Sequence, residues 1–231
     1  MCCFIPEIHN QKDYYRFVHC FGYWVGSCMV LLFYCIIKGH FYKDTEGDTT
    51  MSLELPRKIH IIGSVGSGKT TLARSLSKML QLSFHELDNV VWIRNQSGDI
   101  RRTEQERQEY LQCIIQTDGW IIEGIHQEEW VAQSFQQADC IIFLDTPYKI
   151  RTARIIKRFV KQKIGIEKAH YQPTFSIFFK MFRWNKRFEE VGKPHFFTKR
   201  EDLLDKVLLV QHQKDVDNYF RQFQSIKSVS R

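Results

Sequence analysis

The sequence predicts an α/β domain in which βαβ units surround a parallel sheet, preceded by a hydrophobic N-terminal helix. After Met51, short apolar runs alternate with amphipathic stretches, as strands alternate with crossover helices. A glycine-rich turn at residues 63–70 separates the first apolar run from the first amphipathic stretch. With 231 residues, 43% of them hydrophobic, the chain is long enough for one such domain and a short extension.

Residues 1–50 differ from the rest of the chain. Residues 20–37 are 18 residues without a charge, which is the short end of the range for a membrane-spanning helix, and aromatic residues lie at both ends. Three interpretations stay open: a membrane anchor, a dispensable leader upstream of a start at Met51, and a peripheral hydrophobic helix. Residues 43–51 are a polar linker. We expect a leader (1–50) and a cytoplasmic catalytic domain (51–231), with membrane attachment only through residues 20–37.

Within the domain, each element is predicted from its local pattern. Short apolar runs of strand length predict strands at residues 59–62, 83–87, 120–123, 140–144 and 206–210. Amphipathic stretches predict helices over residues 69–80, 103–117, 128–137, 149–161, 173–190 and 215–223. The second of these helices begins with a capping box, in which Thr103 is the N-cap and Glu106 follows three residues later.

The glycine-rich turn matches G-x-x-x-x-G-K-[ST] at every position, and it lies between a strand and a helix, as phosphate binding requires. Its glycines let backbone N–H groups surround a phosphate, and the helix that follows adds its positive end. Lys69 is expected to reach the β and γ phosphates of ATP, and Thr70 to bind Mg²⁺. The candidate nucleotide-binding residues are Gly63, Ser64, Gly66, Ser67, Gly68, Lys69, Thr70 and Thr71.

Two acidic residues follow buried-type strands and are candidates for the metal site beside Thr70. Glu123 ends the Trp-Ile-Ile run, and Asp145 follows Ile-Ile-Phe-Leu. A carboxylate at either position can orient metal-bound water. The alternative for each is an acid that caps a strand end.

Three further residues are candidates for catalysis. Arg154 and Arg158 are four residues apart and share a helical face, where their charges suit a transferring phosphoryl group. Asp88 follows the second strand and could orient an acceptor hydroxyl. The alternatives are a solvated basic helix face for the arginines and a lone acid in a turn for Asp88.

Charge and the remaining reactive residues narrow the function classes. Residues 1–50 carry four Lys/Arg and five Asp/Glu, so the net charge of +7 becomes +8 for residues 51–231. Such a domain suits nucleotides and also nucleic acid, although no helix-turn-helix or zinc module is recognisable. The histidines have no metal-ligand spacing and are expected to be structural or exposed; they include His126, His170, His195 and His212.

Four segments together resemble a known family: IHIIGSVGSGKTTLARSLSKML, HELDNVVW, GWIIEG and ADCIIFLDTP. They are similar to adenylate-kinase-like P-loop proteins, and most of all to the group known as DNA topology modulation proteins, over residues 57–223. The resemblance implies a three-layer α/β/α P-loop NTPase fold with a mostly five-stranded parallel sheet, and phosphoryl transfer from ATP. It also implies that Arg154 packs on the nucleotide base and that Arg158 binds phosphate.

The chain departs from adenylate kinases after the third strand. It continues Glu-Gly-Ile-His-Gln from Glu123, where those enzymes have Asp-Gly-Phe-Pro-Arg, so it lacks the phosphate-binding arginine at that place. The resemblance therefore does not imply AMP as the acceptor. We expect an ATP- and Mg²⁺-dependent kinase with a small-molecule or nucleotide acceptor. The alternatives are a nucleotide-dependent regulatory or DNA-associated protein and a membrane-attached accessory protein.

Overall fold

A computed structural model describes residues 55–95, 98–167, 174–212, 215–216 and 219–220. The leader, its segment 20–37, His170 and most of the helix predicted at residues 215–223 lie outside these residues. In the described part of the chain, no helix has both the length and the apolar character needed to cross a bilayer. Arg200–Asp205 belong to a separate compact unit from the other described residues and contribute most of a 3-10 helix, η3 (Glu201–Lys206).

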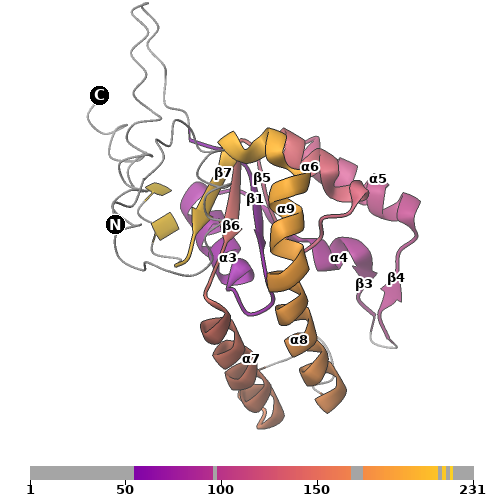
Figure 1. The fold of residues 1–231 in the computed structure, drawn as a ribbon. Coiled ribbons are helices and arrows are strands. Elements are labelled where there is room, and N and C mark those ends of the chain that lie inside the picture. The colour runs from indigo at the N-terminus through magenta and orange to yellow at the C-terminus, as the bar shows by residue number, and fades with distance from the viewer. Residues whose placement is uncertain (1–54, 96–97, 168–173, 213–214, 217–218, 221–231) are drawn as a thin grey trace, which may run out of the picture. The chain divides into compact units, whose positions relative to one another are not determined.

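The elements follow the predicted alternation (Figure 1). The strands are β1 (Lys58–Gly63), β2 (Phe84–Glu86), β3 (Trp92–Ile93), β4 (Ile100–Arg101), β5 (Trp120–Gly124), β6 (Cys140–Leu144) and β7 (Val207–Val210). The helices are α3 (Lys69–Leu80), α4 (Leu87–Val91), α5 (Glu104–Ile115), η1 (Glu129–Val131), α6 (Ala132–Gln137), α7 (Tyr148–Lys163), α8 (Phe175–Arg187), η2 (Phe188–Gly192) and α9 (Lys193–Lys199).

Five strands form one parallel sheet in the order β2-β5-β1-β6-β7, which confirms the predicted fold class. β1 is central, and the register pairs Ile62 with Gly124 on β5 and Gly63 with Leu144 on β6. The carboxyl ends of these three strands therefore meet at one edge of the sheet. In open parallel sheets, that edge is where ligands bind.

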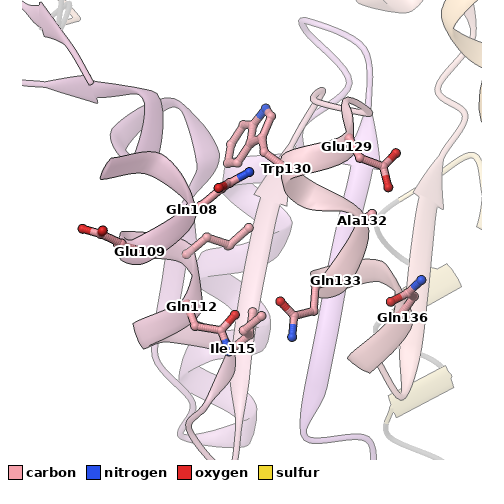
Figure 2. Close-up of a pocket in the computed structure, with 10 residues that line it drawn as sticks. Gln108, Glu109, Gln112, Ile115, Glu129, Trp130, Ala132, Gln133 and Gln136 are labelled. Atoms are coloured by element: carbon pink, nitrogen blue, oxygen red, sulfur yellow. The ribbon is translucent and has the colours of Figure 1, made fainter. Parts of the chain in front are cut away.

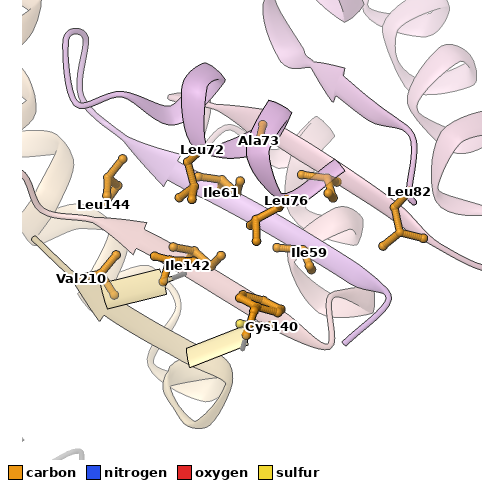
Figure 3. Close-up of a cluster of buried hydrophobic side chains, with 13 residues drawn as sticks. Ile59, Ile61, Leu72, Ala73, Leu76, Leu82, Cys140, Ile142, Leu144 and Val210 are labelled. Carbon is orange, nitrogen blue, oxygen red and sulfur yellow. The ribbon is translucent and has the colours of Figure 1, made fainter. Parts of the chain in front are cut away.

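Helices cover both faces of the sheet, and β1 is accordingly buried on both of them. Ile59 and Ile61 face α3 and belong to the core drawn in Figure 3. That core also contains Leu72, Ala73, Leu76, Leu82, Ile121, Cys140, Ile142, Leu144, Val210, Val216 and Phe220. On the other face, the His60 ring stacks on Phe135 of α6, with 3.8 Å between the ring centroids. The ring centroids of Phe143 and Phe196 of α9 are 5.0 Å apart. The three-layer arrangement is thus confirmed.

Local signals explain most element boundaries. The capping box of α5 is present, since the Glu106 N–H donates to Thr103 Oγ1 at 3.2 Å and the Thr103 N–H donates to Glu106 Oε2 at 2.7 Å. The second strand is shorter than predicted, because Leu87, Val90 and Val91 are buried at helical spacing and form α4.

Other elements that the sequence did not predict include β3, β4, η2 and α9. The polar loop after Trp92 contains an antiparallel β3–β4 hairpin, in which Trp92 pairs with Arg101 and the guanidinium lies 5.9 Å from the indole ring. In place of one helix over residues 173–190, the structure has α8, which ends at Arg187. The π-helical turn η2 and then α9 follow it without a break. Strands of two residues are too short to show an alternating pattern, so the hairpin has no strong local signal.

Candidate active site

The glycine-rich loop joins β1 to α3 at the carboxyl edge of the sheet, in a conformation that requires glycine. Gly66 has a φ of 75° and Gly68 a φ of 102°, both in the left-handed region. A Cβ on Gly66 would lie 2.9 Å from the carbonyl oxygen of Arg151, so α7 packs directly on the loop. Because Gly68 has no side chain to cap α3, the first N–H groups of that helix are available to an anion.

Two cationic side chains converge on the loop from different elements. Lys69 Nζ donates to the carbonyl oxygen of Ser64 at 3.0 Å. Arg154, from α7, donates through Nη1 to the carbonyl oxygen of Ser67 at 2.7 Å. The structure therefore places both predicted cations at the phosphate-binding loop, although 85 residues of chain separate them.

Burial and nearby charged side chains shift the pKa of Lys69. Burial lowers the pKa of its ammonium group, while the carboxylates of Glu123 and Asp88 oppose that shift. Arg158 and Arg151 lower the Lys69 pKa further by repulsion. Lys69 therefore interacts electrostatically with two of the candidate acids, Glu123 and Asp88, and with one of the candidate arginines, Arg158.

Glu123 contacts Thr70, as a shared metal site requires. Thr70 Oγ1 donates to Glu123 Oε1 at 2.5 Å, and Glu123 is 5% exposed at the end of β5. Burial raises the pKa of Glu123, against the opposing effects of Lys69 and of the Thr70 hydrogen bond. The hydrogen bond holds a hydroxyl and a carboxylate together beside the loop, and both are oxygen ligands of the kind that Mg²⁺ takes.

Asp145, the other candidate metal ligand, is engaged differently. Its Oδ2 accepts a hydrogen bond from Lys193 Nζ of α9 at 2.7 Å. The next residue, Thr146, is buried and donates to the carbonyl oxygen of Ser67 at 3.1 Å. The end of β6 therefore supports the loop, while a metal role for Asp145 stays a prediction.

Asp88 lies in α4 and contacts His126, one of the histidines that were expected to be structural or exposed. His126 Nε2 is 3.6 Å from Asp88 Oδ1, and His126 Nδ1 is 3.2 Å from Glu128 Oε2. His126 comes two residues after β5 ends, so it emerges at the same sheet edge as Glu123. The sequence-based expectation of a structural or exposed histidine did not include these contacts. The sequence signal for them is that His126 closely follows the Glu-Gly pair at the end of β5.

The pKa values of His126 and Asp88 are both shifted from their ordinary values. Burial alone would lower the pKa of His126, but the hydrogen bonds and charges of Asp88 and Glu128 outweigh it and raise the pKa to about 9. The His126 hydrogen bond lowers the pKa of Asp88, with a further contribution from Lys69. At neutral pH, Asp88 is therefore an exposed carboxylate held beside an imidazolium and close to the loop lysine.

The His126 pair should make folding stability pH-dependent. A histidine whose pKa is about 9 in the folded state and 6.5 when unfolded stabilises the fold fully below pH 6.5 and loses that contribution as pH rises through 9. We expect wild-type Tm to fall by about 2–4 °C more than that of His126→Gln between pH 6.5 and 9.5. Thermal unfolding of both proteins across that range measures the difference, and parallel curves would contradict the pairing.

The side chains of the other two arginines of α7 pair with glutamates, whereas that of Arg154 donates to loop carbonyls. Arg151 is 1% exposed and forms an ion pair with Glu189. Arg158 is about half exposed, with its Nε 3.4 Å from Glu167 Oε1. Its predicted phosphate contact stays a prediction, as does a nucleotide contact for Thr71, which is exposed.

A groove of about 610 Å³ lies elsewhere, between α5 and the η1–α6 segment (Figure 2). Its lining mixes polar and apolar side chains and is formed by Gln108, Glu109, Leu111, Gln112, Ile115, Glu129, Trp130, Ala132, Gln133 and Gln136. None of these is a loop residue or a candidate acid, so the groove is separate from the site at the strand ends.

Known proteins share part of this arrangement. A family model described as AAA domain matches residues 59–171, which run from β1 to just beyond α7 and make up a little under half of the chain. Shikimate kinase from Psychrobacter cryohalolentis is 27% identical over 119 residues, 45% of this chain and 61% of its own. Shikimate kinase from Legionella pneumophila (strain Corby) is 32% identical over 87 residues, 31% of this chain and 50% of its own.

Solved structures were matched as well. Shikimate kinase from Bacteroides thetaiotaomicron is 14% identical, with a TM-score of 0.42, over 75% of this chain and 99% of its own. A gluconokinase from Sinorhizobium meliloti 1021 is 15% identical, with a TM-score of 0.39, over 76% of this chain and 98% of its own. The chain spans about half to three-fifths of the length of the curated relatives it matches. It is therefore similar to AAA domains over residues 59–171, and to shikimate kinases over less than half of its length.

Proposed function

We propose that this chain is a phosphotransferase that moves the γ-phosphoryl group of ATP to the hydroxyl of a small molecule in the presence of Mg²⁺. The observation that carries the proposal is the 2.5 Å contact between Thr70 of the loop and Glu123 at the end of β5. This contact brings the Thr70 hydroxyl, a predicted metal ligand, to a buried carboxylate, and Lys69 interacts electrostatically with both Glu123 and Asp88.

Phosphoryl transfer needs positioning and charge more than covalent chemistry, and the residues supply both. The N–H groups at the start of α3 and the Lys69 ammonium bind the phosphates. Arg154 donates to the loop carbonyls of Gly66 and Ser67 and can add a second positive charge as negative charge moves to the leaving group. Thr70 and Glu123 would hold Mg²⁺, which when bound neutralises phosphate charge.

Asp88 has the features of the group that receives the acceptor's proton. Its side chain is 65% exposed, so an acceptor hydroxyl can reach it, and its carboxyl is ionised at neutral pH and can accept a proton. In the proposed step, the acceptor oxygen forms a bond to the γ-phosphorus while the bond from that phosphorus to the β,γ-bridging oxygen breaks. The bond's electron pair leaves with ADP, and the acceptor's hydroxyl proton passes to an Asp88 oxygen.

The acceptor class is proposed from the partial relatives. They are named as kinases of shikimate, and a small hydroxylated molecule is thus the first class to test. A nucleotide acceptor is the second class, from the resemblance to adenylate-kinase-like proteins. Membership of the DNA topology modulation group, with a DNA-associated role, remains a prediction.

ADP production distinguishes these functions. The full chain is incubated with ATP and Mg²⁺, and with one candidate acceptor at a time: shikimate, gluconate, nucleosides, nucleoside monophosphates or duplex DNA. We expect ADP release to depend on one of the small molecules and to stop when EDTA removes Mg²⁺. ADP release stimulated by duplex DNA and by none of the small molecules would overturn the kinase proposal in favour of the DNA-associated alternative.

A further inference from the structure

A stripe of polar side chains runs along the helical segment formed by α8, η2 and α9, and it touches the surroundings of the glycine-rich loop. Its members, Asn185, Glu189 and Lys193, are four residues apart and therefore lie about one turn from each other on one side of the segment. In Figure 1, α8 and α9 follow each other as one helical column, and α8 lies beside α7. We call these three residues the polar stripe.

Asn185 joins the loop to α7 through two hydrogen bonds, of which the one to Ser64 is buried and the one to Thr152 is part-buried. Ser64 Oγ donates to Asn185 Oδ1 at 3.1 Å, and Asn185 Nδ2 donates to Thr152 Oγ1 at 3.2 Å. Both Ser64 and Asn185 are 0% exposed. Ser64 directly follows the first glycine of the loop, so Asn185 contacts the turn at its beginning.

The other two members contact the elements on either side of the loop. Glu189 forms an ion pair with the buried Arg151, whose carbonyl oxygen lies against Gly66. Lys193 Nζ is 2.7 Å from Asp145 Oδ2, one residue before the threonine that donates to the loop. Taken with Asn185, the stripe reaches the loop, the start of α7 and the end of β6.

The π-helical turn η2 falls within the stripe. Gln127 Nε2 donates to the carbonyl oxygen of Gly192 at 3.0 Å, so the segment after β5 also holds this turn. Single π-helical turns occur often at functional sites. Burying an asparagine and a hydroxyl against the loop is costly unless both are hydrogen-bonded, whereas an apolar pair would cover the loop without that cost. The satisfied polar contact therefore points to a role in orientation.

We propose that Asn185 is a positioning residue for ATP, which holds Ser64 and thereby the first turn of the loop in its phosphate-binding conformation. Through Thr152 it also fixes α7, so that Arg154 reaches the loop. This inference rests on the proposed function to the extent that the loop binds ATP. It needs no identified acceptor, because its effect is on nucleotide binding.

The test is the dissociation constant of ATP with Mg²⁺, measured by calorimetry on the full chain. We expect Asn185→Ala to weaken ATP binding about tenfold, because it removes a buried hydrogen bond and leaves the Ser64 hydroxyl unpaired. Lys186→Ala is the matched control: its side chain is 67% exposed, it pairs with Glu190, and its replacement should leave ATP affinity unchanged. Wild-type ATP affinity in Asn185→Ala would overturn the inference.

A double-mutant cycle with Ser64→Ala shows whether the effect passes through the hydrogen bond. We expect Asn185→Ala to weaken binding in the wild-type background and to add less than about twofold in the Ser64→Ala background. Fully additive losses would mean that Asn185 acts on the fold alone, and would overturn the inference. If Asn185→Ala does not fold, Ser64→Ala tests the same bond from the loop side, and unchanged ATP affinity there would contradict it.

Different results would contradict ATP binding by the loop and the positioning role of Asn185. Absence of ATP binding to the wild-type chain, or unchanged binding in Lys69→Ala, contradicts the proposed function itself. ATP binding that is strong in the wild type, lost in Lys69→Ala and unchanged in Asn185→Ala contradicts only the positioning role.

Discussion

Replacing Lys69 by alanine is expected to weaken ATP binding by about 100-fold or more and to abolish ATP-dependent phosphoryl transfer. The ammonium group lies at the loop, bonded to the Ser64 carbonyl, and its lowered pKa shows that burial already disfavours its charge. A bound phosphate group would add negative charge to that of Glu123 and Asp88 and so favour the charged form of Lys69. The variant loses that attraction, which in a partly buried site is screened little by solvent.

Calorimetry with ATP and Mg²⁺ measures the loss. Lys78→Ala is the matched control, since Lys78 is an exposed lysine in the last turn of the same helix. Thermal unfolding without nucleotide should differ little between wild type and Lys69→Ala, because the variant removes a charge that burial destabilises. ATP binding at wild-type strength in Lys69→Ala would rule out the loop as the nucleotide site.

Replacing Asp88 by asparagine is expected to slow phosphoryl transfer by about 10²–10⁴-fold while ATP affinity stays close to that of the wild type. Asparagine keeps the shape of the side chain but cannot accept the acceptor's proton. Asp88 lies in α4, outside the loop, so its contribution to nucleotide binding is confined to its charge interaction with Lys69. Steady-state kinetics with the acceptor identified by ADP production separate kcat from the ATP dependence.

A second measurement tests the contact with His126. The Asp88 carboxylate is one of two groups that raise the His126 pKa to about 9, so Asp88→Asn should lower it towards the value that Glu128 alone supports. NMR titration of the imidazole reports this change directly. Asp118→Asn, at an exposed position before β5, is the control for both measurements. A wild-type transfer rate in Asp88→Asn, with its His126 pKa lowered, would assign Asp88 to structure and remove it from the reaction.

Much of the fold followed from local sequence. β6 and β7 are runs of five and four apolar residues, and β1, β5 and β6 are buried along nearly their whole length, as central strands of a parallel sheet are. The α5 helix began where its capping box predicted. Leu87–Val91 was placed partly in a strand because five residues are too few to establish helical periodicity, and burial against neighbouring elements decided it. The β3–β4 hairpin depends on a cross-strand pairing of Trp92 with Arg101 that no local signal predicts.

The site divides in the same way. The loop from Gly63 to Thr70 was determined by the sequence itself, because its phosphate-binding conformation depends on glycines and a lysine at fixed spacing within eight residues. Only the tertiary structure decided the partners. Glu123 meets Thr70 across 53 residues, and Asn185 meets Ser64 across 121, because parallel strands and long crossover helices bring distant segments to one sheet edge. Spacing along the chain does not predict such contacts. They depend on the order of the strands in the sheet and on where the helices pack against it.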